Sequence, residues 1–124
     1  MKQTIIYRFP LIAYCIFIFV QSSFPSPEVI PTFAFSDKLL HLVGYALLGA
    51  LSVRAFKREF KNYSRLKVII YAIIFSTLYG FSDELHQSMV SVRVAEGMDV
   101  LFDFFGSVIG ATLFYRDIPY IDDF

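Results

Sequence analysis

The sequence predicts an all-α fold in which four short transmembrane helices form a bundle, with both termini on the cytoplasmic side. Apolar residues make up 56% of the 124 residues and the mean hydropathy is +0.59. A compact soluble helical protein of this size would need a more polar surface. The apolar residues form four runs, and the expected spans are about 5–21, 38–56, 66–83 and 99–115. The length allows a single domain, 1–124.

The four runs are short for membrane spans, because a helix needs roughly 17–25 residues to cross the hydrocarbon core. We therefore expect their polar ends to lie at or just inside the membrane interface, with Tyr and Phe at the segment ends as anchors. Between the first two spans, Pro25, Pro27 and Pro31 predict an extended loop. Ser36 is expected to cap the second helix, with Asp37 in its first turn.

The first span has an alternative interpretation as a signal peptide. Lys2 and Arg8 precede an apolar stretch, and Ser22 and Ser23 stand where cleavage would occur. The A-x-A pattern of a cleavage site is missing, and four retained spans account better for the rest of the chain.

Charge is distributed unevenly between the two sides of the predicted bundle, although the net charge is zero. Nine of the eleven basic residues fall on one side, and these are Lys2, Arg8, Arg54, Lys57, Arg58, Lys61, Arg65, Lys67 and Arg116. The other side has Lys38, Arg93 and seven of the eleven acidic residues. The positive-inside rule makes the basic side cytoplasmic. The zero net charge argues against a nucleic-acid-binding protein, which needs a basic excess.

Most of the distinctive polar residues fall on the side that is predicted to face outward. They are Asp37, Lys38 and His41 at the start of the second span, Asp83, Glu84, His86 and Gln87 at the end of the third, Arg93 in the next loop, and Asp99 and Asp103 at the start of the fourth. Within each helix the group includes pairs three or four residues apart, which share a helix face. We therefore expect these faces to point into the bundle, at one level of the membrane.

The chemistry of these residues indicates two roles. A histidine beside a carboxylate can exchange protons near neutral pH, so the candidate catalytic residues are His41, Asp83, Glu84 and His86. The candidate ligand-binding residues supply charges and hydrogen bonds, and they are Asp37, Lys38, Gln87, Arg93, Asp99 and Asp103. Arg93 would hold a phosphate or carboxylate group. The same histidines and carboxylates suit a divalent metal ion, and the sequence leaves the cofactor open.

A purely structural explanation covers part of this set. Asp37, Asp99 and Asp103 would cap or begin helices, and Asp83 would pair with Arg93. Capping does not explain the run from Asp83 to Gln87, because the dipole disfavours anions at a helix C-terminus.

The order and spacing of the short motifs resemble the VanZ-like family of bacterial integral membrane proteins. The matching elements are Gln21-Ser22-Ser23 with Pro25, Asp37-Lys38-x-x-His41, Ser82-Asp83-Glu84-x-His86-Gln87, Arg93, Asp99, Gly106 and Gly110. The family is named for a protein linked to resistance to the glycopeptide teicoplanin. It usually has an asparagine where this chain has Asp103, so this chain carries an additional carboxylate in an already acidic site.

The resemblance implies a multi-pass protein of the bacterial cytoplasmic membrane that acts on the cell envelope. Its partners would be the lipid bilayer and an envelope lipid or glycopeptide, which the polar cluster would bind or modify. Ser22, Ser23 and Ser82 are available as nucleophiles, although no diagnostic motif surrounds them. The alternatives are a small four-helix exporter that works as a dimer and a non-catalytic membrane scaffold. Gly106 and Gly110 would let another helix approach closely, including one from a second copy.

The charge distribution makes a prediction about topology. A cysteine introduced as Lys61→Cys should react with a membrane-impermeant maleimide only after the membrane is opened, because the loop around it is expected inside. Labelling of Lys61→Cys in intact cells would invert the orientation and place the polar cluster inside the cell.

Overall fold

The computed structural model describes residues 2–23, 36–89 and 97–115, and the described part consists mainly of four helices. The helices are α1 (Lys2–Ser22), α2 (Ser36–Glu59), α3 (Arg65–Ser88) and α4 (Gly97–Phe114). All four are long and apolar enough to cross a membrane, and no strand occurs among the described residues. The predicted all-α, four-span fold is therefore confirmed.

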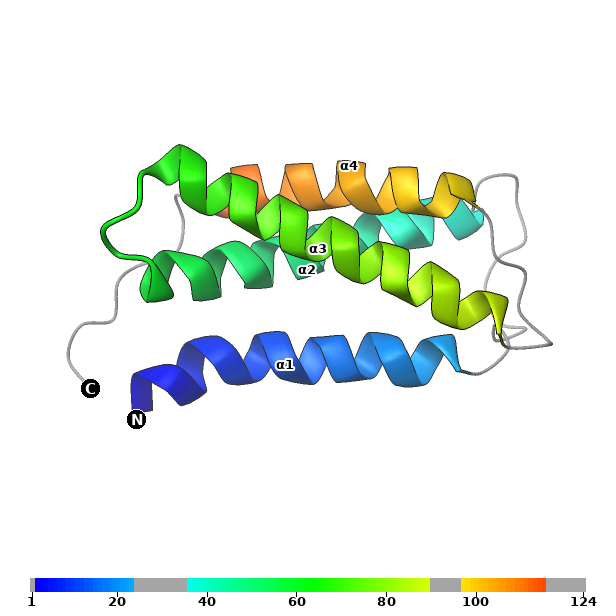
Figure 1. Cartoon of the computed structure of the whole chain (residues 1–124), viewed down its shortest axis with the longest axis horizontal. Coiled ribbons are helices and arrows are strands. Elements are labelled where there is room, and N and C mark those ends of the chain that lie inside the picture. The colour runs from blue at the N-terminus through cyan, green and yellow to red at the C-terminus, as the bar shows by residue number, and fades with distance from the viewer. Residues whose placement is uncertain (1, 24–35, 90–96, 116–124) are drawn as a thin grey trace.

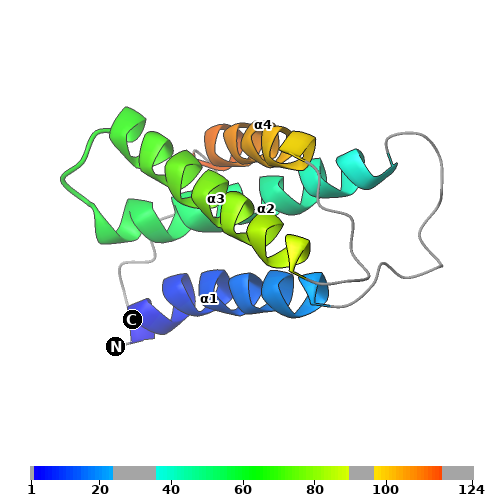
Figure 2. The same ribbon diagram turned by 45° about the vertical axis from the view of Figure 1, so that its right-hand side comes forward.

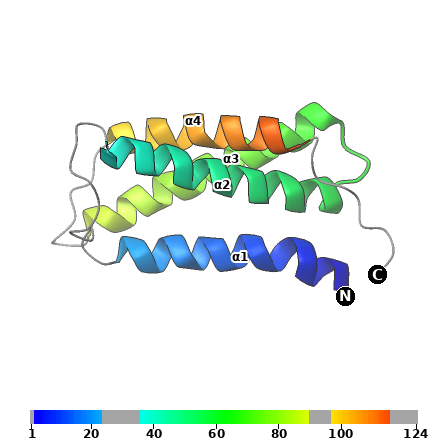
Figure 3. The ribbon, with the colours of Figure 1, turned by 180° about the vertical axis from the view of Figure 1, so that it is seen from behind.

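The helices run side by side, and consecutive helices point in opposite directions (Figure 1). α1 and α4 lie on opposite sides of the bundle, and α2 and α3 lie between them and contact both. The view from behind shows the same order (Figure 3), and the turned view shows α3 crossing its neighbours obliquely (Figure 2). This arrangement brings the end of α1, the start of α2, the end of α3 and the start of α4 to one end of the bundle.

α1, α2 and α3 extend beyond the expected spans at both ends, whereas α4 begins two residues before its expected start and ends one residue before its expected end. α3 continues five residues past the predicted end at position 83 and stops at Ser88. The difference arises because hydropathy marks only the apolar part of a helix, whereas backbone hydrogen bonding continues through polar residues. At the other end of α3, Ser64 is the N-cap, and its hydroxyl accepts a bond from the Lys67 amide at 3.3 Å.

α2 and α4 approach so closely that glycine is required at their contact. A Cβ on Gly110 would overlap the Ala46 carbonyl, and one on Gly106 would overlap the Leu42 carbonyl. On the α2 side of the contact, a Cβ on Gly49 would lie 2.6 Å from the Ser107 carbonyl oxygen of α4. The expectation that these α4 glycines let another helix approach closely is thus confirmed, and the helix that approaches is α2 of the same chain.

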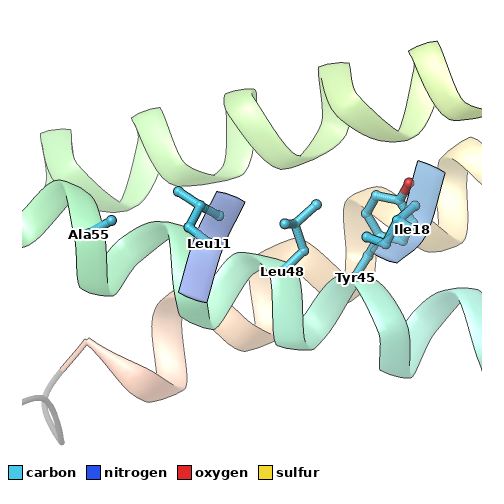
Figure 4. Close-up of a cluster of buried hydrophobic side chains, with 5 residues drawn as sticks. All are labelled: Leu11, Ile18, Tyr45, Leu48 and Ala55. Atoms are coloured by element: carbon cyan, nitrogen blue, oxygen red, sulfur yellow. The ribbon is translucent and has the colours of Figure 1, made fainter. Parts of the chain in front are cut away.

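α1 is part of the bundle and contributes to its core. Leu11 and Ile18 pack against Tyr45, Leu48 and Ala55 of α2 (Figure 4). The first helix therefore has the buried face that a retained span needs. The outward faces of all four helices carry large exposed apolar side chains such as Phe9, Val43, Leu78 and Leu113, as expected for contact with lipid.

A proline within α1 is compensated by an arginine of α2. Pro10 has no N–H, so the carbonyl of Ile6 lacks its usual helical donor. The Arg54 guanidinium donates to this carbonyl at 2.9 Å and also lies over the Tyr7 ring, 4.7 Å from its centroid. An unsatisfied backbone carbonyl is costly in a membrane, so this bond ties α1 to α2.

The glycine contact between α2 and α4 makes a prediction about stability. Gly110→Ala should lower the free energy of unfolding by about 3 kcal/mol, the upper end of the usual cost of overpacking. The cause is that the new methyl group meets backbone, which cannot move aside. Unfolding of the purified protein in detergent measures the change.

The matched control is Gly97→Ala, because nothing lies within 4 Å of a Cβ at position 97. Equal effects of the two substitutions would contradict the close approach of α2 and α4.

Candidate functional site

The predicted site residues gather at the end of the bundle where α1 and α3 finish and α2 and α4 begin (Figure 1). Those whose side chains the structure describes are Lys38, His41, Asp83, Glu84, His86, Gln87, Asp99 and Asp103. Asp37 belongs to α2, but its side chain lies outside the description, and Arg93 lies outside the described residues altogether.

Four charged or titratable side chains of α2 and α4 form one group, which we call the α2–α4 cluster. The Lys38 ammonium donates to Asp99 Oδ1 at 2.8 Å, and His41 Nδ1 lies 2.7 Å from Asp103 Oδ1. His41 Nε2 lies 3.5 Å from Asp99 Oδ2, so the imidazole stands between two carboxylates. Both aspartates are at most 1% exposed. The acidic residues that open α4 therefore point into the bundle, where they are paired with bases of α2.

Asp103 occupies space that a glycine of α3 leaves free. A Cβ on Gly80 would lie 2.7 Å from Asp103 Oδ2 and 3.0 Å from its Cβ. This Oδ2 is buried and has no hydrogen-bond partner within the part of the chain that the structure describes. One oxygen of the Asp103 carboxylate thus contacts His41 of α2, and the other lies against Gly80 of α3. The carboxylate lies where α2, α3 and α4 meet.

A second group, the α1–α3 cluster, is centred on the buried carboxylate of Asp83. The Ser22 hydroxyl donates to Asp83 Oδ1, and the Tyr45 hydroxyl donates to Oδ2 at 3.3 Å. The Gln87 amide lies 3.4 Å from both Asp83 Oδ2 and Ser22 Oγ. Bonds from three helices therefore converge on Asp83. Several donors stabilise a buried carboxylate, which is costly without them.

His86 lies beside this cluster and is bonded to a serine of α1. Its Nε2 is 2.8 Å from Ser23 Oγ, and its ring stacks on Phe19 with the centroids 4.5 Å apart. Sequence analysis gave each histidine a carboxylate partner. For His41 that partner is present, whereas the described hydrogen bond of His86 is to a hydroxyl. Glu84 is buried on the same last turns of α3.

Tyr45 connects the two clusters. Its hydroxyl binds Asp83, and its ring lies parallel to that of His41, with 6.3 Å between centroids. Tyr45 was not among the predicted site residues, and Ser22 and Ser23 were named only as available nucleophiles. Ser22 and Ser23 belong to the Gln21-Ser22-Ser23 motif, which is part of the resemblance to the VanZ-like family, and Tyr45 lies one helical turn after His41. Both features are visible in the sequence and could have indicated these residues.

Metal binding was left open by the sequence. Within residues 2–23, 36–89 and 97–115, no three His, Cys, Asp or Glu side chains are placed to hold a metal ion together.

A family model described as VanZ/LLP1 matches residues 7–118. The chain belongs to the VanZ/LLP1 family. The matched range includes nearly all of α1, the whole of the other three helices, and every site residue described above. Searches of curated proteins and of solved structures found no match. The resemblance inferred from the motifs is thus confirmed, and the four apolar helices identify this VanZ/LLP1 member as a multi-pass membrane protein.

The α2–α4 cluster makes a prediction about coupled charges. His41→Ala should lower the free energy of unfolding by about 3 kcal/mol, because it leaves buried Asp103 without its described partner. The double variant His41→Ala with Asp103→Asn should lose clearly less, since a neutral amide needs no counter-charge. Unfolding of the variants in detergent measures the coupling between the two sites. Additive losses would show that the two side chains do not stabilise each other.

Proposed function

We propose that this VanZ/LLP1 protein lies in the cytoplasmic membrane of a bacterium and uses its polar end to bind or modify an envelope component. The polar end would face outward, and the ligand would be an amphiphilic envelope lipid or a glycopeptide. The consequence for the cell would be protection against teicoplanin. The observation that carries the proposal is the convergence of polar side chains from all four helices on one end of an otherwise apolar bundle.

The charge distribution along the helices supports the outward orientation. The opposite end carries the last turns of α2, the first turn of α3 and the segment between them, which contain Lys57, Arg58, Lys61, Arg65 and Lys67. A basic excess of this kind marks the cytoplasmic side. The proposed site would thus lie on the side where cell-wall precursors and glycopeptides meet.

The composition of the site supports an amphiphilic ligand. Charged and hydrogen-bonding groups at the bundle end can hold a polar headgroup, while the exposed apolar faces of the helices lie beside the hydrocarbon part of the same molecule. Asp37, Lys38 and Arg93 are the candidate contacts to a charged headgroup. His41, His86, Asp83 and Glu84 are the groups able to exchange protons with a bound ligand.

The burial of the carboxylates supports a role for them beyond packing. Asp83, Asp99 and Asp103 are buried at a cost that apolar residues of the same size would avoid. Such residues in membrane proteins are rare and usually functional.

The proposal is tested by teicoplanin susceptibility in a sensitive bacterial host that expresses the protein. Asp83→Asn, His86→Ala and Arg93→Ala should each reduce the minimal inhibitory concentration to that of the host alone. The first removes the charge on which three helices converge, the second removes an imidazole, and the third removes a permanent cation. Immunoblots of the membrane fraction establish that the variants are present.

The control is Lys61→Ala, which removes a cation from the opposite end and should leave protection unchanged. Full protection by all three site variants at normal abundance would contradict the proposed site and favour a scaffold that uses another surface.

A further inference from the structure

We infer that Ser23 is a nucleophile and His86 its general base, and that the bond they attack is the carboxylic ester of an acylated envelope amphiphile. The inference rests on the proposed function, since it gives a reaction to the same site. Its geometric basis is the distance of 2.8 Å between Ser23 Oγ and His86 Nε2. A hydroxyl within hydrogen-bond reach of an imidazole is the arrangement by which serine becomes reactive.

Among the described residues, two acceptors lie within reach of the Ser23 hydroxyl. Besides His86, the Phe19 carbonyl lies 2.9 Å from Oγ. A hydroxyl has one hydrogen and two lone pairs. With its hydrogen on the Phe19 carbonyl, Ser23 accepts a bond from a protonated Nε2. When the ring proton of His86 is on Nδ1 instead, the hydroxyl hydrogen of Ser23 can rotate toward Nε2, and Ser23 becomes the donor. The reactive state thus needs no movement of heavy atoms.

Neighbouring residues hold this pair in place. The ring of Phe19 stacks on His86 and fixes the plane of the imidazole. Ser22, the residue before Ser23, donates to Asp83 and fixes the end of α1 against α3. Asp83 is therefore a positioning residue in this scheme, because it acts on Ser23 through Ser22.

Exposure distinguishes the two adjacent serines. Ser22 is fully buried, whereas Ser23 and His86 are both half-buried, so part of each of these two side chains is accessible. Of the two, only Ser23 combines access with an imidazole partner among the residues described.

The charge of the site favours an acyl carbonyl over a phosphoryl group. Among the side chains that the structure describes at this end, four carry a carboxyl group, those of Asp83, Glu84, Asp99 and Asp103, and Lys38 carries a permanent positive charge. A phosphoryl centre carries negative charge and needs cations around it, whereas an ester carbonyl is neutral. Ser23 also follows directly on a helix that is long and apolar enough to cross a membrane. Such a position would place its hydroxyl where hydrocarbon meets headgroups, close to the ester bonds of lipids.

The step balances without a cofactor. Ser23 Oγ forms a bond to the ester carbonyl carbon while its proton passes to His86 Nε2. The bond from that carbon to the alkoxy oxygen then breaks, and the leaving oxygen takes the proton from His86. Water or a second alcohol releases the acyl group from Ser23 in the same way, with its proton passing through His86 back to Ser23 Oγ.

An alkyl fluorophosphonate probe tests the inference in membranes that contain the full chain. Reaction forms a bond from Ser23 Oγ to phosphorus and expels fluoride, and peptide mass spectrometry locates the adduct. We expect labelling of the parent at Ser23, none at this position in Ser23→Ala, and a labelling rate at least about 100-fold lower in His86→Gln, the usual minimum for loss of a general base. Because the adduct is mapped on the parent, the result does not depend on how the variants fold.

The matched controls are Ser82→Ala and Ser88→Ala. Both hydroxyls are exposed on α3 near the same end, and each donates to a backbone carbonyl three residues back, at 2.7 and 2.6 Å. These variants should label like the parent. An unlabelled parent, or an adduct on another serine, overturns the inference.

Failure of the inference is distinguishable from failure of the proposed function. If the parent stays unlabelled while Asp83→Asn still abolishes teicoplanin protection, the nucleophile is wrong and the proposed function stands. If Ser23 is labelled but no site variant alters protection, the nucleophile stands and the link to glycopeptides is wrong.

Discussion

The rest of the structure depends on the close contact between α2 and α4. Lipid is as apolar as a leucine side chain, so helices in a membrane are not driven together by the hydrophobic effect and rely on packing and polar bonds. Gly49, Gly106 and Gly110 remove the side chains that would hold the two backbones apart. The same approach brings Lys38 and His41 against Asp99 and Asp103. Backbone packing and charge pairing are therefore consequences of one geometric fit.

The two polar clusters differ in what they leave accessible. In the α2–α4 cluster, Asp99 and Asp103 are fully buried and each has a base as its partner. Beside the α1–α3 cluster, His86 and Ser23 are half-buried, and their bond joins an imidazole to a hydroxyl. A buried ion pair is suited to fixing the arrangement of helices, whereas a partly exposed imidazole and hydroxyl are suited to contact with a ligand. At the polar end, the α2–α4 cluster thus suits stabilisation of the bundle, whereas Ser23 and His86 suit contact with a ligand.

Much of the fold could be predicted from the sequence, because span length and apolar composition are local properties. The choice of site residues was also local, since Asp99 and Asp103, or Asp83 and Gln87, share a helix face by spacing alone. The partners could not be predicted, because the rotation of each helix about its axis is set by contacts between helices. The pairing of His41 with Asp103, of Ser22 with Asp83 and of Ser23 with His86 each joins residues more than sixty positions apart. The partner of the α4 glycines could not be identified for the same reason, since spacing shows that a helix approaches but does not show which one.

The contact between Gly80 and Asp103 has a consequence for the evolution of this family. The carboxylate of Asp103 on α4 occupies the space that a side chain at position 80 of α3 would need. The side chains at these two positions therefore compete for the same small volume. A side chain at position 80 can be accommodated only if the residue at position 103 becomes smaller or turns away from His41. Substitutions at these two positions should therefore be inherited together, and an alignment of VanZ/LLP1 sequences should show covariation between them even though they are far apart in the chain.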